Sequence, residues 1–214
     1  MKAVKLQLAT ATLLNPKAAQ WGKVPAEDVQ LSGTPLHLQP SRYIRTVWAG
    51  KQVGAVRMVR VQAVHNAQYL FFRLSWRDDT KNDSFADGSV FPDAAAVVFP
   101  MNGKAPLECD GSADSPVNLW FWKANKADTA ENLISRGLAT EEPAAGVTIE
   151  TRARWENGRW DVVIARPIKA ANRETAPVST AKPNKVGFAV WDGGSQERGS
   201  LHAQSREWRE LVVE

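Results

Sequence analysis

The chain has 214 residues, a length typical of one domain with a sizeable hydrophobic core. Its net charge is +4, but its 27 basic residues are interspersed with 23 acidic ones and form no run. This pattern favours a solvated surface over a nucleic-acid interface. The single cysteine excludes an internal disulfide and a cysteine-cluster metal site, and no apolar run reaches the ~20 residues that span a bilayer.

Residues 1–21 share one feature with an export signal, because two lysines precede the apolar stretch LQLATATLL. Polar residues interrupt this stretch at Gln7, Thr10 and Thr12, and no small-residue cleavage site follows. We therefore expect either a mature chain or one that is exported by other means.

Alternating apolar and polar residues predict two strands, at 56–64 and 69–76. The residues between them, HNAQ, predict a β-hairpin with His65 and Asn66 in the turn. The following segment, 77–93, is polar and contains glycine, which indicates a long loop.

Two apolar segments, 94–100 and 117–124, predict buried or half-buried strands. The connection between them contains proline and glycine, as expected for a loop. Residues 127–136, ADTAENLISR, form the only segment with a helical pattern, and we expect a short helix there.

A second hairpin is predicted for the strands 147–155 and 159–168. The dipeptide Asn157–Gly158 supplies the positive φ angles of a type I′ turn, which would set Trp155 opposite Trp160. This spacing indicates an antiparallel pair.

Strands at 186–192 and 208–214 close the chain. Many short strands, turn signals between them and almost no helix predict an all-β fold, an antiparallel β-sandwich with one or two short helices. We expect one domain over 1–214, since no repeat, linker or low-complexity tract interrupts the sequence.

No catalytic signature is present, and His37 and His65 lie in segments where a structural role is expected. Met101, Cys109 and His202 lie in loops at strand ends, and these are side-chain types that ligate haem iron. On composition alone the plainer interpretation leads, because a lone cysteine is usually a small buried hydrophobe.

Nine tryptophans against two tyrosines favour a large planar partner. Trp120 and Trp122, two residues apart in a predicted strand, share one face of it. Surface tryptophans on a β-sandwich could also stack on sugar rings, so a carbohydrate-binding module is the alternative function.

Three segments carry a family resemblance: VQAVHNAQYLFFRLSWRDDTKND (61–83), PVNLWFWKA (116–124) and FAVWDGGSQERG (188–199). They resemble the haem-binding γ subunits of ethylbenzene dehydrogenase, dimethylsulfide dehydrogenase, selenate reductase and chlorate reductase. The resemblance extends from about residue 56 to the end of the chain. It implies a β-sandwich similar to family-nine carbohydrate-binding modules that holds one non-covalent haem b.

The resemblance also implies the two axial ligands of the haem iron. The family has a lysine a few residues after ERG, and His202 takes that place here. The family's methionine-glycine position falls on Cys109-Asp110-Gly111, so Cys109 is the expected sulfur ligand, with Met101 as the alternative. Asn118, Trp120, Trp122 and Trp191, which lie in the matching motifs, are expected to line the haem pocket.

By the same resemblance, the chain is expected not to be catalytic alone. In the family, a molybdenum-cofactor α subunit converts the substrate and an iron–sulfur β subunit relays electrons to or from the γ haem. The haem exchanges electrons with a soluble periplasmic c-type cytochrome. Export with the complex, through a twin-arginine signal of the α subunit, would place this chain in the periplasm, and neither a nucleic-acid partner nor a membrane span is expected.

Overall fold

The structure is a computed structural model that describes residues 1–126, 128–169 and 174–214. It contains thirteen strands and two short α-helices among these residues. In chain order they are β1 (Lys2–Lys5), α1 (Thr10–Leu14), β2 (Glu27–Gly33), α2 (Arg42–Val47), β3 (Met58–His65), β4 (Tyr69–Arg77), β5 (Ala94–Pro100), β6 (Val117–Lys123), β7 (Thr129–Ser135), β8 (Glu142–Pro143), β9 (Ile149–Trp155), β10 (Arg159–Pro167), β11 (Asn184–Trp191), β12 (Ala203–Ser205) and β13 (Arg209–Val213). Short 3₁₀ helices occupy Ala19–Lys23, Leu36–Leu38, Leu107–Cys109 and Ala124–Lys126.

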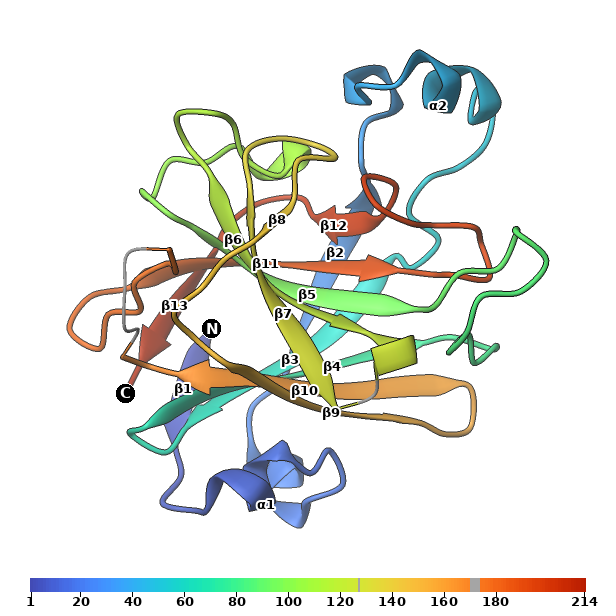
Figure 1. The fold of residues 1–214 in the computed structure, drawn as a ribbon. Coiled ribbons are helices and arrows are strands. Elements are labelled where there is room, and N and C mark those ends of the chain that lie inside the picture. The colour runs from blue at the N-terminus through green and yellow to red at the C-terminus, as the bar shows by residue number, and fades with distance from the viewer. Residues whose placement is uncertain (127, 170–173) are drawn as a thin grey trace.

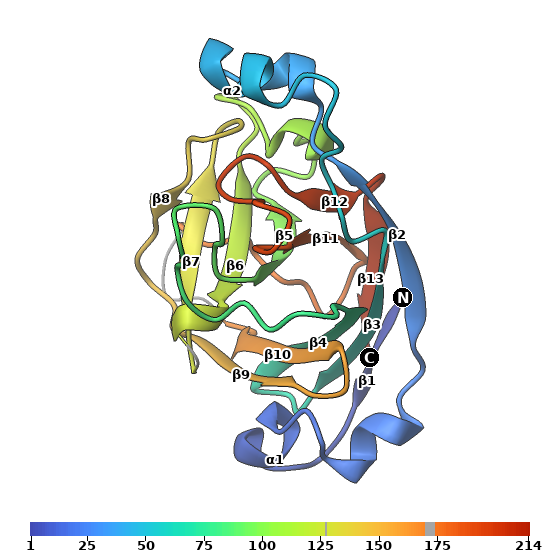
Figure 2. The ribbon, with the colours of Figure 1, turned by 90° about the vertical axis from the view of Figure 1, so that its right-hand side faces the viewer.

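The strands form one sheet in the order β1-β13-β11-β12-β2-β3-β4-β10-β9-β7-β6-β5, with β8 paired to β7. An additional pairing between β11 and β5 closes this sheet on itself (Figure 1). Figure 2 shows β5, β6 and β7 as one wall, β2, β3 and β13 as the opposite wall, and β4, β9 and β10 between them. The predicted all-β sandwich with short helices is thus confirmed.

Both predicted hairpins are present. In the first, Asn66 lies in the turn as predicted, but the turn position predicted for His65 is wrong, because His65 is the last residue of β3 and pairs with Leu70 of β4. In the second, Asn157 and Gly158 have φ angles of 52° and 71°, and Trp155 pairs with Trp160 across the strands, as predicted. Positive φ at both turn residues gives the connection the twist that the flanking strands require.

The helix predicted for 127–136 is wrong over the described residues 128–136, where the structure has β7 instead; residue 127 lies outside them. This strand pairs with β6 over six positions and buries Leu133 and Ile134. Strand pairing overrides local helix propensity here, as tertiary context commonly does. The two α-helices lie elsewhere, and no helix of the described residues is long and apolar enough to cross a membrane.

The main hydrophobic core fills the space enclosed by the sheet. Its aromatic centre contains Phe99 stacked on Trp120 with ring centroids 4.7 Å apart, and Phe72 edge-on to both. Trp122 packs edge-on against Trp160 at 5.1 Å. Offset and edge-on aromatic pairs of this kind add to the stabilisation from buried apolar area.

Two smaller apolar clusters lie on the outer faces of the sheet. One is covered by the N-terminal segment that contains α1, which packs Leu13 and Trp21 against β4 and β10. The other lies on the outer face of β5, β6 and β11 and is the one that carries the candidate site. Its buried members are Ala94, Ala96, Val98, Ala105, Leu107, Val117, Leu119, Leu133, Ala189 and Trp191.

Asn118 of β6 is a buried polar residue inside the main core, and its side chain forms several hydrogen bonds. Its amide donates to Asn132 Oδ1 at 2.7 Å and to the Leu133 carbonyl at 2.9 Å. Its oxygen accepts from Trp120 Nε1 and from the Ala176 backbone N–H. One side chain therefore satisfies groups from β6, β7 and the segment after β10.

We predict that Asn118→Ala lowers the free energy of unfolding by about 3 kcal/mol, because the substitution leaves several buried donors and acceptors unpaired. Urea denaturation followed by circular dichroism measures this loss. Asn102→Ala is the matched control, since Asn102 is exposed and its loss is expected to cost less than about 1 kcal/mol. Equal losses in the two variants would contradict the role of Asn118.

Candidate functional site

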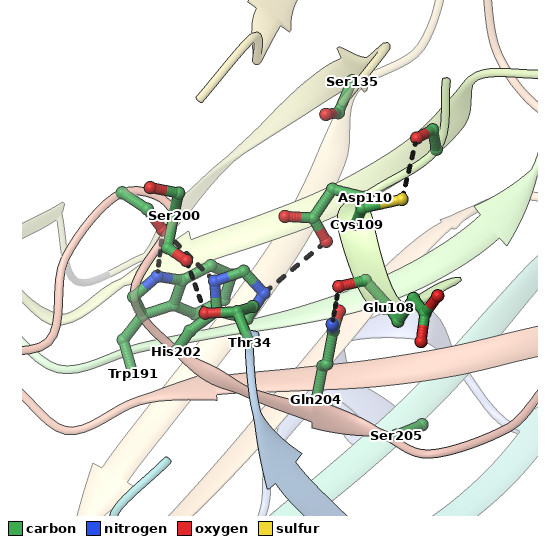
Figure 3. A network of polar contacts seen from close by, with 12 residues as sticks. Thr34, Glu108, Cys109, Asp110, Ser135, Trp191, Ser200, His202, Gln204 and Ser205 are labelled. Carbon is green, nitrogen blue, oxygen red and sulfur yellow. Dashed lines mark hydrogen bonds and ion pairs between the residues drawn. The ribbon is translucent and has the colours of Figure 1, made fainter. Parts of the chain in front are cut away.

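The candidate site lies where two connections meet over the outer face of β5, β6 and β11. One connection is 192–202, which follows β11 and contains the ERG motif. The other is the 3₁₀ turn Leu107–Cys109 with the residues after it. His202, at the end of the first connection, is 0% exposed, and its ring faces Asp110 of the second (Figure 3).

Each edge of the His202 ring has a defined environment. Nδ1 lies 3.2 Å from the Gly199 carbonyl, and Nε2 forms an ion pair with Asp110 Oδ1 at 3.5 Å. The ring lies over Trp191 with centroids 4.3 Å apart. The Gly199 carbonyl favours a proton on Nδ1 and the Asp110 carboxylate favours one on Nε2, so Nε2 can bind another ligand only after it has lost its proton.

Two opposing effects act on the protonation of His202. Burial lowers the pKa of the ring, but the Asp110 carboxylate, the Gly199 carbonyl and Glu141 together outweigh burial, so the pKa lies above its ordinary value. Asp110 is 2% exposed, and its Oδ2 has no hydrogen-bond partner among the described residues. The pair therefore places an ionisable ring and an incompletely satisfied carboxylate together in a site without water access.

The backbone at Asp110 and Gly111 aims the carboxylate at His202. Asp110 adopts a left-handed conformation with φ of 55°, which aspartate tolerates better than most residues, and Gly111 follows with φ of 89°. A Cβ at Gly111 would lie 3.0 Å from the carbonyls of Ser115 and Ser135. The turn therefore requires glycine at this position.

Glu197, the first residue of the ERG motif, holds the 192–202 connection in place. It is 1% exposed; Oε1 accepts from the backbone N–H groups of Gly54 and Ala55 at 2.6 and 2.9 Å, and Oε2 accepts from that of Asp192 at 3.1 Å. Burial raises the pKa of its carboxyl, and these three donors offset part of that effect. One buried carboxylate thus joins the ERG loop to the segment before β3.

Further hydrogen bonds fix the residues on either side of His202. Gln39 and Thr34 donate to the Ser200 carbonyl at 2.9 and 2.6 Å, and the Ser200 hydroxyl donates back to Gln39. Gln204 donates to the Glu108 carbonyl at 2.8 Å, joining β12 to the 3₁₀ turn (Figure 3). His202 is therefore held by a rigid frame on both sides.

A cavity of about 200 Å³ lies beside this frame, along the Trp191 side. Its walls are largely apolar, and two cations lie at it: Lys123 above the ring of Phe85 and Arg198 above that of Phe91. The lining residues are Phe91, Pro92, Ala94, Leu119, Phe121, Lys123, Leu133, Glu141, Trp191, Glu197, Arg198 and Gly199. The cavity therefore offers an apolar surface together with positive charge.

The structure does not bring either sulfur atom to His202. Cys109 is partly buried, and its Sγ is directed to the Gly111 carbonyl at 3.5 Å, away from the imidazole (Figure 3). Burial raises the pKa of this thiol, with the charges of Glu108 and Asp110 acting in the same direction. Met101 packs against the main core inside the sheet. The side chain that faces His202 is Asp110.

Of the four expected pocket residues, only Trp191 adjoins His202. Asn118, Trp120 and Trp122 are buried and point to the inside of the sheet, whereas the alternate residues of β6 face the outer cluster. Both faces of β6 are apolar, so the sequence alternation does not indicate which face adjoins the site. The structure thus places these three residues in the core, on the opposite face from His202.

Two residues of the site were not expected from the sequence, namely Asp110 and Glu197. Glu197 lies in the ERG motif, and Asp110 directly precedes the glycine at the expected ligand position. Its position next to this glycine was the one feature of the sequence that could have identified Asp110.

The sequence pattern of the family described as ethylbenzene dehydrogenase matches residues 18–147 and 136–203. The chlorate reductase subunit gamma of Ideonella dechloratans is 34% identical over 96% of this chain and 82% of its own. A Haloferax mediterranei protein, provisionally named a respiratory nitrate reductase heme subunit, is 30% identical over 90% of this chain and 66% of its own.

Among solved structures, a family 9 carbohydrate-binding module of Caldicellulosiruptor kristjanssonii, in complex with glucose, superimposes with a TM-score of 0.55. The alignment covers 100% of this chain and 95% of the module at 7% sequence identity. A structural likeness at this low sequence identity is evidence for a shared fold alone and says nothing about the ligand.

We predict that Glu197→Ala lowers the free energy of unfolding by about 3 kcal/mol, because three backbone donors lose a buried, charged acceptor. The same change should speed proteolysis within 192–202, which mass spectrometry of the fragments would locate. Glu207→Ala is the control, since the Glu207 side chain is 77% exposed. Unchanged stability in Glu197→Ala would show that this carboxylate does not hold the loop.

Proposed function

Because the chain belongs to the ethylbenzene dehydrogenase family, we propose that it is an electron-transfer γ subunit that binds one haem b. The observation that carries this proposal is the family match over most of the chain, together with a buried histidine at the family's ligand position. When bound, the haem would supply a one-electron redox centre. The task of this chain is then to hold the iron and shield it from solvent.

His202 suits an axial ligand of haem iron. The Gly199 carbonyl accepts from Nδ1, so Nε2 would be the ligating atom; in this structure Nε2 is paired with Asp110, which the iron would have to displace or share. Histidines that ligate metals commonly have such an acceptor on the second ring nitrogen. The frame around Ser200 and Gln204 limits rotation of the ring.

The cavity beside His202, whose walls do not include His202 itself, has features that suit a flat apolar group with acidic substituents. The outer face of β5 and β11 offers the small side chains of Ala94, Ala96 and Ala189. Lys123 and Arg198 at the neighbouring cavity could pair with the carboxylates that haem b carries. An apolar site with charged groups at its edge is typical of cofactor pockets.

The second ligand would come from the turn opposite His202. Position in the family motif favours Cys109, with Met101 as the alternative, whereas the side chain that faces Nε2 is that of Asp110. A thiolate or a carboxylate stabilises ferric iron by its negative charge, whereas a neutral thioether raises the reduction potential. The identity of this ligand therefore sets the potential at which the subunit works.

For partners, we propose a molybdenum-cofactor α subunit and an iron–sulfur β subunit, with a c-type cytochrome as the soluble electron carrier. The relative from Ideonella dechloratans is itself named a γ subunit of a reductase. A periplasmic location, reached by export with the complex, completes the proposal. Substrate conversion belongs to the α subunit, and this chain is non-catalytic.

The carbohydrate-binding alternative lacks its main structural support. Sugar rings need an accessible aromatic platform, yet Trp120 and Trp122 are 0% exposed in the main core. All nine tryptophans lie in the described part of the chain, and each is buried or only partly exposed. The likeness to carbohydrate-binding modules therefore extends to the fold alone.

We predict that His202→Ala loses haem or converts it to a high-spin form, because the substitution removes a strong axial ligand. The visible absorption spectrum of protein reconstituted with haemin reports this change. His37→Ala and His65→Ala are the matched controls and should retain the wild-type spectrum. A low-spin spectrum unchanged in His202→Ala would remove the ligand assignment.

A second prediction concerns the sulfur ligand. We expect Cys109→Ser to change the spectrum of the haem-loaded protein and to raise its potential, because an anionic ligand is lost. Met101→Leu should leave both unchanged. Near-infrared absorption, electron paramagnetic resonance and redox titration are the measurements.

Asp110→Asn distinguishes the remaining candidate from the sulfur ligands. Loss of a near-infrared band in Met101→Leu alone would assign Met101 as the ligand. A spectral change in Asp110→Asn, with Cys109→Ser unaffected, would instead assign the carboxylate. Either outcome would contradict the assignment to Cys109.

A further inference from the structure

Three aspartates from distant parts of the chain converge at one end of the sheet. Asp78 directly follows β4, Asp93 directly precedes β5, and Asp192 directly follows β11. One carboxylate oxygen of each lies within 4.8 Å of the others. The cluster lies outside the His202 site, although Asp192 adjoins Trp191 in sequence.

This cluster is buried and incompletely satisfied. Asp93 is 0% exposed, and it accepts from the backbone N–H groups of Asn82 and Gly193 and from Trp160 Nε1. Asp78 is 7% exposed, and its Oδ2 has no hydrogen-bond partner among the described residues. An unpaired carboxylate oxygen in a buried acidic cluster is costly unless a proton or a cation compensates its charge.

No basic side chain supplies that compensation. Within the described residues, no lysine, arginine or histidine forms an ion pair with these aspartates, and three of the four arginines that line the adjoining groove have other partners. Arg60 pairs with Asp28, Arg77 with Asp79, and Arg159 donates to Ser75. Burial, with the charge of a neighbouring aspartate, raises the pKa of Asp78 to about 6 and that of Asp93 to about 7.

Neutral oxygen atoms complete the surroundings. The Asp78-x-Thr80-x-Asn82 segment places Thr80 Oγ1 2.9 Å from Asn82 Oδ1. A Cβ added to Gly194 would meet Asn82 Oδ1, Thr80 Oγ1 and Asp192 Oδ1 at 2.9 to 3.3 Å. Only glycine leaves this space free. Carboxylate, amide and hydroxyl oxygens thus gather around one point.

We propose that Asp78, Asp93 and Asp192 bind a calcium ion, with the side-chain oxygens of Thr80 and Asn82 as further candidate ligands. Hard oxygen donors with several carboxylates are the ligand set of Ca²⁺. Ca²⁺ takes about six to eight oxygen ligands in flexible geometry, whereas Mg²⁺ usually keeps several waters and is bound through one or two carboxylates. Three carboxylates with neutral oxygens beside them therefore suit calcium better than magnesium.

The ion has a route to this site. A groove of about 580 Å³ that opens to solvent is lined by Asp78, Thr80 and Asp192, and its walls also include Arg57, Arg60, Arg77 and Arg159. Bound calcium would join the 77–93 loop to the base of the 192–202 connection. It would thereby stabilise the loop that ends at His202, but it would bind whether or not the chain holds haem.

Terbium luminescence tests this proposal directly, because Tb³⁺ occupies calcium sites and nearby tryptophan sensitises its emission. Trp160 Nε1 lies 2.9 Å from Asp93 Oδ2, so the sensitiser is in place. Titrating haem-free full-length protein with Tb³⁺ should give saturable emission on tryptophan excitation. Ca²⁺ should displace the Tb³⁺ at concentrations at least about tenfold below those of Mg²⁺.

Asp192→Asn should weaken Tb³⁺ binding by about tenfold or more, since it removes one charged ligand. Asp79→Asn is the matched control: it removes a neighbouring carboxylate that is 73% exposed and should leave binding unchanged. Asp192 is only partly buried, so its variant should fold even where a change at Asp93 does not. Calcium should also raise the thermal midpoint of the wild type more than that of Asp192→Asn.

Three results would overturn the proposal. The first is no sensitised emission from the wild type. The second is equal Tb³⁺ affinity in Asp192→Asn and Asp79→Asn. The third is displacement by Mg²⁺ as efficient as by Ca²⁺. None of these depends on haem binding, so failure here is distinguishable from failure of the proposed function.

Discussion

The pairing of β11 with β5 is the constraint on which the rest of the molecule depends. It joins β5, at one end of the strand order, to β11, the third strand from the other end, so the main core is enclosed by sheet on its sides. Because β11 also pairs with β12 and β13, its position is fixed from both edges. The residues after it, Trp191 and Asp192, therefore leave the sheet at a defined place. The end of β11 therefore determines where His202 lies and where Asp192 meets the other two clustered aspartates.

On the outer face of β5, β6 and β11, the burial of polar side chains lowers the stability of the fold, which suggests that these side chains have a function. His202 and Asp110 form a buried ion pair at 3.5 Å, and Oδ2 of Asp110 has no hydrogen-bond partner among the described residues. A chain selected for stability alone would have well-packed apolar residues there at little cost. Buried ionisable groups that lower the stability of the fold are typically found where a ligand binds. Haem at His202 would supply the missing interaction.

The sequence predicts local structure well and the assembly of the site only in part. Alternation and the Asn157–Gly158 turn predict the hairpins, because both are local properties. The strand β7 was predicted as a helix, since a short segment such as AENLIS fits both patterns. Trp120 and Trp122 could not be assigned to the core, because β6 is apolar on both faces. Asp110 and the three clustered aspartates depend on contacts between distant segments, which no single stretch of sequence reveals.

The central claim is that this chain holds a haem through His202. Its most direct test is the visible spectrum of the purified chain titrated with haemin. Saturation at one haem per chain, with the sharp Soret and α/β bands of a six-coordinate low-spin iron, is the predicted result. A protein that remains colourless, or that binds haemin without saturation and without low-spin bands, would contradict it.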